Sequence, residues 1–132
     1  MREFDNDIIQ LINTFEAITK ADVRDCIKNN MIYFVVNPGK TGKAIGKGGK
    51  TIKAAQNMLK TNIRIFEWAE DQRQFVKNLI PQAKQIRISG EEVEVRVGEK
   101  YKGAVIGKGG TNIKVLNEIL SRNSELRSLR VL

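Results

Sequence analysis

Two short segments of the chain place a lysine among glycines in the same order. Gly46–Gly49 and Gly107–Gly110 both read Gly-Lys-Gly-Gly. Because glycine adopts positive φ angles and lets other groups approach the backbone closely, such a turn can aim its main-chain amides at a phosphate. The lysine, Lys47 or Lys108, adds a mobile positive charge beside those amides. These residue types predict binding to a chain of phosphates, a contact that holds a nucleic acid without selecting its bases.

Two other interpretations of the glycines were weighed. A glycine-rich corner between helices can be only a tight turn, but neither a turn nor packing requires the lysine that both copies carry. The spacing of the glycines does not match the phosphate-binding loops of nucleotide-binding enzymes. The Walker pattern needs a glycine where Phe34 stands, and the dinucleotide pattern needs a final glycine where Thr51 and Asn112 stand.

Both segments belong to a longer internal repeat. Residues 42–53 and 103–114 match at an offset of 61 residues, with eight of twelve positions identical. A repeat of this kind indicates a duplicated structural unit. We therefore predict two modules, 1–68 and 69–132, with the boundary near Trp68.

The elements around each copy follow from the period of the apolar residues. Each half is predicted to run helix, strand, strand, short helix, glycine loop, helix and strand. This order predicts the α+β class, with α/β layers, and in each module a three-stranded sheet covered by helices. The opening helices are predicted at 5–18 and 71–79. The helix after each loop has one apolar face, formed by Ile52, Ala55, Met58 and Leu59 after the first loop and by Ile113, Leu116, Ile119 and Leu120 after the second. The predicted strands are 22–28, 31–36, 62–67, 84–89, 93–97 and 126–132.

The charge of the chain favours a polyanionic partner. Lys and Arg number 23 against 15 acidic residues, a net charge of +8. Each half carries +4, from 11 minus 7 in residues 1–68 and 12 minus 8 in residues 69–132. No acidic residue occurs between Ile27 and Phe66 or between Lys100 and Asn117. Positive charge thus surrounds both glycine segments, as expected for attraction to nucleic acid or to an acidic membrane surface.

The residues around the loops resemble a known family signature. Ile45–Ile52 and Ile106–Ile113 both fit Ile-Gly-x-x-Gly-x-x-Ile, which is similar to the motif of KH domains. The order of elements resembles the type II arrangement of that fold. The pair as a whole resembles the short archaeal NusA-like transcription factors, and this resemblance covers nearly the entire chain.

The resemblance implies a hydrophobic groove beside each loop that holds about four nucleotides of single-stranded RNA, with the loop clamping the backbone. Isoleucines would line or support each groove, and glycines and lysines would bind the phosphates. The implied RNA-binding residues are Ile45, Gly46, Lys47, Gly48, Gly49, Lys50, Ile52 and Lys53 in the first module, and Ile106, Gly107, Lys108, Gly109, Gly110, Ile113 and Lys114 in the second.

The function that the resemblance implies is binding of single-stranded RNA in transcription termination, antitermination or elongation, with the transcription machinery as a further partner. An RNA-processing or ribosome-assembly accessory is one alternative. Another is a protein-interaction scaffold with inactive loops, although both loops keep their glycines and lysine. Tyr101, in a basic stretch before Gly103, is the best candidate for stacking on a base.

Composition indicates a binding protein rather than an enzyme. The chain has no histidine and a single cysteine, Cys26, and its one dense acidic group, Glu91, Glu92 and Glu94, fits a solvated hairpin at Gly90. We expect no metal and no cofactor. No apolar run is long enough to span a membrane and residues 1–5 lack the core of a signal peptide, so a cytoplasmic monomer is expected.

Overall fold

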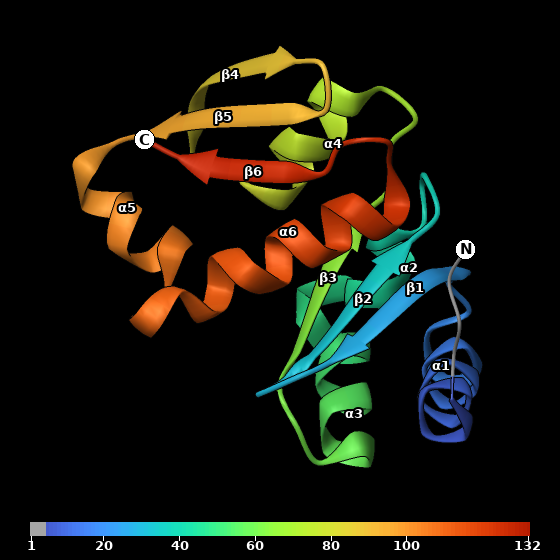
Figure 1. Cartoon of the computed structure of the whole chain (residues 1–132). Coiled ribbons are helices and arrows are strands. Elements are labelled where there is room, and N and C mark those ends of the chain that lie inside the picture. Colours follow the sequence, from blue (N-terminus) through green and yellow to red (C-terminus); the bar gives the residue numbers. More distant parts are fainter. Residues whose placement is uncertain (1–4) are drawn as a thin grey trace. The chain divides into compact units, whose positions relative to one another are not determined.

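The computed structural model describes residues 5–132, and the segment 1–4, on which the prediction of no signal peptide partly rests, lies outside the described residues. The chain divides into two compact units between Trp68 and Ala69. Figure 1 shows their helices and strands.

The first unit contains a three-stranded sheet in the order β1-β2-β3. Strand β1 pairs with β2 antiparallel, whereas β2 pairs with β3 parallel. A parallel pair needs a crossover connection, and α2, the 3₁₀ turn η1 and α3 supply it. The elements are α1 (Asn6–Thr19), β1 (Val23–Lys28), β2 (Ile32–Val36), α2 (Thr41–Ile45), η1 (Lys47–Gly49), α3 (Lys50–Leu59) and β3 (Ile63–Glu67).

The second unit repeats this topology. Its sheet has the order β4-β5-β6, with β4 and β5 antiparallel and β5 and β6 parallel. The order of elements in both units confirms the predicted α+β class and the predicted succession of helices and strands. The elements are α4 (Gln72–Leu79), β4 (Ala83–Ser89), β5 (Glu92–Val97), α5 (Glu99–Ile106), η2 (Lys108–Gly110), α6 (Thr111–Asn123) and β6 (Ser128–Val131).

The core of the first unit lies between its sheet and its helices. Phe15 of α1 stacks on Phe34 of β2, with ring centroids 3.9 Å apart and planes inclined by 15°. All five residues of β2 are buried, as is usual for a strand that is apolar along its whole length. Every helix of the unit contributes, and the cluster comprises Phe15, Ala21, Cys26, Ile32, Phe34, Val36, Ala44, Ala55 and Ile63.

The core of the second unit follows the alternation in β5. Val93, Val95 and Val97 are buried, whereas of the residues between them Glu94 is half-buried and Arg96 is exposed. This period of two is what a sheet with one covered face produces. Figure 1 shows α4 and α6 on the covered side, and they contribute buried side chains: Phe75, Val76 and Leu79 from α4 and Val115, Leu116, Ile119 and Leu120 from α6.

The opening helix of each unit starts at an aspartate cap. The Asp5 carboxylate accepts a hydrogen bond from the Ile8 amide at 2.9 Å. The Asp71 carboxylate accepts from the Arg73 and Gln74 amides at 2.9 and 3.3 Å. Such caps satisfy amides of the first turn that have no partner inside the helix.

Two expectations from the sequence need correction. Met58 is 65% exposed, so the covered side of α3 runs through Ile52, Ala55 and Leu59. A spacing of three and then four residues keeps these three side chains on one stripe of the helix, and Met58 lies outside that stripe. The last strand is also shorter than residues 126–132, because the Leu126 amide bonds to the Ser124 hydroxyl at 3.1 Å and β6 begins only at Ser128.

The Phe15–Phe34 stack provides a test of the first core. Phe34→Ala should lower the free energy of unfolding by about 3–5 kcal/mol, because a fully buried ring leaves a cavity. Urea unfolding followed by circular dichroism measures the change. Met58→Ala is the control and should alter stability by no more than about 0.5 kcal/mol. An equal effect of the two substitutions would contradict the described core.

Candidate nucleic-acid interface

Each glycine loop lies at the corner of the crossover between two parallel strands. In the first unit the Gly46 amide donates to the Gly42 carbonyl at 2.9 Å, and the Gly49 amide donates to Gly46 at 3.1 Å. The second unit has the same two bonds, Gly107 to Gly103 at 2.8 Å and Gly110 to Gly107 at 3.0 Å. The first bond ends one helix, and the second closes the turn before the next.

The backbones of the two loops adopt the same conformation. Gly46, Gly48 and Gly49 have φ angles of 76°, 64° and 76°. Their counterparts, Gly107, Gly109 and Gly110, have φ angles of 80°, 64° and 77°. Every glycine of both motifs is therefore in the positive-φ region that other residues rarely adopt. The two loops therefore share one turn geometry.

The first glycine of each motif is required by close contact as well as by its φ angle. A Cβ atom at Gly46 would lie 2.2 Å from Thr51 Oγ1 and 2.8 Å from the Thr51 nitrogen. A Cβ at Gly107 would lie 2.7 Å from the Asn112 nitrogen. By contrast, nothing lies within 4 Å of a Cβ at Gly48 or Gly109. The first glycine lets the two helices meet, and the second leaves its side of the loop open.

The lysines of the predicted site are all exposed. Lys47 lies between Gly46 and Gly48 at the tip of the first loop, and Lys108 has the same place in the second. Within residues 5–132, none of these ammonium groups is engaged in a hydrogen bond or an ion pair. Their charge is thus available to solvent or to a ligand; the exposed lysines are Lys47, Lys50, Lys53, Lys108 and Lys114.

The helices that follow the loops begin without a side-chain cap. No capping side chain accepts a hydrogen bond from the first-turn amides of α3, which follows Gly49, or of α6, which follows Gly110. This contrasts with the aspartate caps of α1 and α4. The first amide of each helix donates to the carbonyl of the loop lysine, Lys50 to Lys47 and Thr111 to Lys108. The absence of a side-chain cap and the positive end of the helix dipole still suit an anion. Each motif thus joins backbone donors to a nearby ammonium group.

The four isoleucines of the motif flank the loops. Ile45, at the end of α2, is 39% exposed, whereas Ile52 on α3 is half-buried and packs against the core of its unit. Ile106 and Ile113 are both half-buried. In each unit the structure therefore brings together the predicted glycines, lysines and isoleucines in one corner. Within each pair, one isoleucine ends the helix before the loop and the other lies on the helix after it.

Asn112, in the first turn of α6, makes a contact with the preceding helix that the motif did not reveal. Its Nδ2 atom donates a hydrogen bond of 2.7 Å to the carbonyl of Val105, in the last turn of α5. The Thr111 hydroxyl donates to the Lys108 carbonyl at 3.0 Å. Asparagine and threonine commonly bond to nearby backbone at helix ends, so their type was a local signal for such contacts.

Tyr101 on α5 keeps an exposed ring. It is 40% exposed, and the Lys100 ammonium lies 4.9 Å from the ring centroid. The ring can offer a flat surface to a base, with a cation beside it. Its role in stacking stays a prediction.

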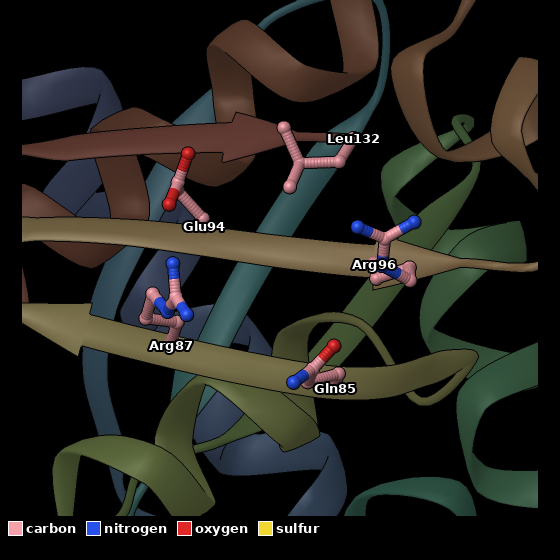
Figure 2. Close-up of a pocket in the computed structure, with 5 residues that line it drawn as sticks. All are labelled: Gln85, Arg87, Glu94, Arg96 and Leu132. Carbon is pink, nitrogen blue, oxygen red and sulfur yellow. The ribbon is translucent and has the colours of Figure 1, made fainter.

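The outer face of the second sheet carries a separate hollow. Figure 2 shows Gln85, Arg87, Glu94, Arg96 and Leu132 around it. Cross-strand register places Glu94 opposite Arg87 on one side and Arg130 on the other, with an ion pair of 3.7 Å between Arg130 and Glu94. Opposite charges in one row stabilise a solvated sheet, so this face needs no ligand to explain it.

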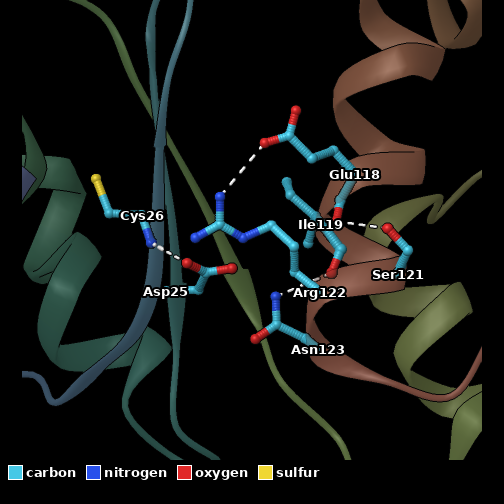
Figure 3. Close-up of polar contacts among 7 residues, drawn as sticks. All are labelled: Asp25, Cys26, Glu118, Ile119, Ser121, Arg122 and Asn123. Carbon is cyan, nitrogen blue, oxygen red and sulfur yellow. Dashed lines mark hydrogen bonds and ion pairs between the residues drawn. The ribbon is translucent and has the colours of Figure 1, made fainter. Parts of the chain in front are cut away.

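Two further polar contacts each lie within a single strand or helix. Figure 3 shows the buried Asp25 carboxylate accepting a hydrogen bond of 2.9 Å from the Cys26 amide, and the Arg122–Glu118 ion pair of 3.4 Å along α6. Cys26 belongs to the first core. Across residues 5–132, no cluster of three or more His, Cys, Asp or Glu could hold a metal ion. Nor does this part of the chain contain a helix of the length and hydropathy needed to cross a membrane.

The fold and the loops together define an α+β protein of two repeated modules. Comparison with known proteins agrees, since the family model for the KH domain matches residues 10–70 and 71–129. The crystal structure of APE1850 is 33% identical, with a TM-score of 0.77 over 98% of this chain and 100% of that chain.

Three similar proteins share the name "Probable transcription termination protein NusA". That of Methanococcus vannielii is 34% identical over 93% of this chain and 75% of its own length. That of Thermoplasma acidophilum is 31% identical over 96% and 93%. That of Methanocaldococcus jannaschii is 29% identical over 94% and 72%. The chain belongs to the KH-domain family, as a short NusA-like protein with two tandem modules.

The close contact at Gly46 provides a test of the loop geometry. Gly46→Ala should lower the free energy of unfolding by about 1–3 kcal/mol, because alanine is strained at this φ angle and its Cβ meets Thr51. Thermal unfolding measures the effect. Gly48→Ala, where φ is also positive but the space is open, is the matched control and should cost less. A greater loss at Gly48 would contradict the described packing.

Proposed function

We propose that this protein binds single-stranded RNA through its two glycine loops and acts in transcription, in termination, antitermination or elongation. In this proposal each module, 1–68 and 69–132, binds one segment of the strand. The observation that carries it is the duplicated loop, with the same φ angles, an exposed lysine at the tip and an uncapped helix behind it. A turn needed only for folding would require the glycines but not Lys47 and Lys108.

The chemistry of the loop supports backbone binding first. Backbone amides and ammonium groups contact phosphates of any sequence, so they position the strand without selecting bases. Selection would fall to the surface beside each loop, where Ile45 and Ile52, or Ile106 and Ile113, can contact unstacked bases. A duplex keeps its bases stacked and cannot make these contacts, so single strands are the proposed ligand.

The role in transcription is supported by the relatives. Their shared name refers to termination, and their identity to this chain is 29–34% for the three proteins compared above. The proposed partners are therefore RNA and the transcription machinery. Two linked modules on one strand would also bind more tightly than either alone, because the second binding event becomes intramolecular.

Charge reversal at the loop tips tests the proposal. Lys47→Asp and Lys108→Asp, alone and together, should each weaken binding of a labelled single-stranded RNA about a dozen nucleotides long, by roughly tenfold or more, since a charge-assisted contact becomes repulsive. Fluorescence anisotropy measures the affinity.

The controls for this test carry the same change of charge at exposed positions away from the loops. Lys28→Asp, at the end of β1, and Arg96→Asp, on β5, should weaken binding much less. Equal losses in loop and control variants would reduce the interaction to general attraction by a basic protein. RNA binding that survives the double loop variant would refute the proposed site.

Salt dependence offers a second measurement. Removing one phosphate contact from a single strand should flatten the slope of log K against log salt by about 0.7. Lys47→Ala should therefore lower the slope by no more than about one unit. A complex of the intact protein that does not respond to salt would contradict the electrostatic basis of the proposal.

A further inference from the structure

We propose that the two loops hold RNA by different physical means. The first loop relies on its larger number of lysines. The second relies on side-chain hydrogen bonds that brace the loop, fixing its conformation before RNA binds. This inference rests on the proposed function and deepens it. It assigns residues 43, 50 and 51 in the first repeat, and their counterparts Ala104, Thr111 and Asn112 in the second, as the determinants of the difference.

The first observation is the unequal number of cations in two motifs with the same backbone. Residues 42–53 contain four lysines, at positions 43, 47, 50 and 53, whereas residues 103–114 contain two, at 108 and 114. Neither segment contains an acidic residue. Ala104 and Thr111 stand where the first motif has Lys43 and Lys50. The first loop can thus neutralise up to two more phosphates.

The second observation is a set of side-chain hydrogen bonds found in one loop only. Asn112 ties the start of α6 to the Val105 carbonyl at 2.7 Å, and Thr111 ties it to the Lys108 carbonyl at 3.0 Å. Val105 lies in the last turn of α5, whose carbonyls lack partners inside the helix. These two bonds therefore join the end of α5, the tip of the loop and the start of α6.

The first loop lacks this bracing. Lys50 and Thr51 occupy the matching positions, and among the described residues neither side chain makes a hydrogen bond to the loop or to α2. The first corner relies on the backbone bonds Gly46 to Gly42 and Gly49 to Gly46, which both loops share. At these two positions the second loop therefore has two bracing hydrogen bonds, whereas the first loop has one additional cation, Lys50.

These differences affect binding in separate ways. Each cation that neutralises a phosphate adds about 0.7 to the salt slope for a single strand. A braced loop loses less conformational freedom when the ligand binds. The resulting gain in affinity does not depend on salt. The first loop should therefore dominate at low salt, and the second should retain more of its affinity as salt rises.

The first experiment isolates each loop in the full-length chain. Lys108→Asp leaves the first loop active, and Lys47→Asp leaves the second active, with the same change of charge in both variants. Affinity for the single-stranded RNA is measured between about 50 and about 200 mM salt. Two additional phosphate contacts should steepen the slope of the first loop by about 1.4, so that it loses about sevenfold more affinity over this range.

The second experiment exchanges two of the three assigned determinants. Lys50→Thr/Thr51→Asn in the Lys108→Asp chain should flatten the slope of the first loop by about 0.7. Thr111→Lys/Asn112→Thr in the Lys47→Asp chain should steepen the slope of the second loop by the same amount. The two exchanged proteins serve as controls for each other, because each receives the residues that the other loop has at the same positions.

A third variant separates bracing from charge. Asn112→Ala should weaken RNA binding by the second loop without changing its salt slope, and should speed amide hydrogen exchange at Gly109 and Gly110. Thermal unfolding identifies any variant that has lost its fold. An Asn112→Ala protein with unchanged exchange and unchanged affinity would refute the bracing.

The outcomes distinguish this inference from the function on which it rests. Equal salt slopes in the two single-loop proteins, with RNA bound by both, would overturn the division between the loops and leave RNA binding intact. A steeper slope for the second loop would overturn it as well. Failure of the intact protein to bind RNA would overturn both.

Discussion

The parallel pairing of two strands in each unit is the constraint on which the site depends. Strand β2 lies beside β3, and β5 beside β6, in the same direction, so no hairpin can join them. The chain must cross over the sheet between them. In both units a short helix, a glycine corner and a second helix make that crossing. The loop is thus a necessary part of the fold before it has any function.

The corner can be tight because glycine permits both its backbone angles and its contacts. The meeting of Gly46 with Thr51, and of Gly107 with Asn112, brings the end of one helix against the start of the next. The lysine at the tip is the part that folding does not explain. It lies on a connection that the sheet requires, at the beginning of a helix without a side-chain cap, where an anion is stabilised by several weak effects together.

Two copies of one fold need not be two copies of one function. The loops share their backbone angles, yet residues 42–53 carry four lysines and residues 103–114 carry two. Hydrogen bonds from Thr111 and Asn112 occur where the first motif has Lys50 and Thr51. Duplication keeps the geometry that the crossover imposes. The exposed positions around it are free to differ in charge, because they contribute little to the core.

The sequence by itself determined the repeat, the α+β class, the order of elements and the residues of both motifs. Apolar periodicity and glycine placement are local signals, and the identity of residues 42–53 with 103–114 needs no structure to be seen. Tertiary structure alone decided that Met58 faces solvent, that β6 begins at Ser128 and that Asn112 braces its loop on Val105. Those outcomes depend on which groups meet after the helices pack, and a pattern along one segment carries no record of its neighbours in space.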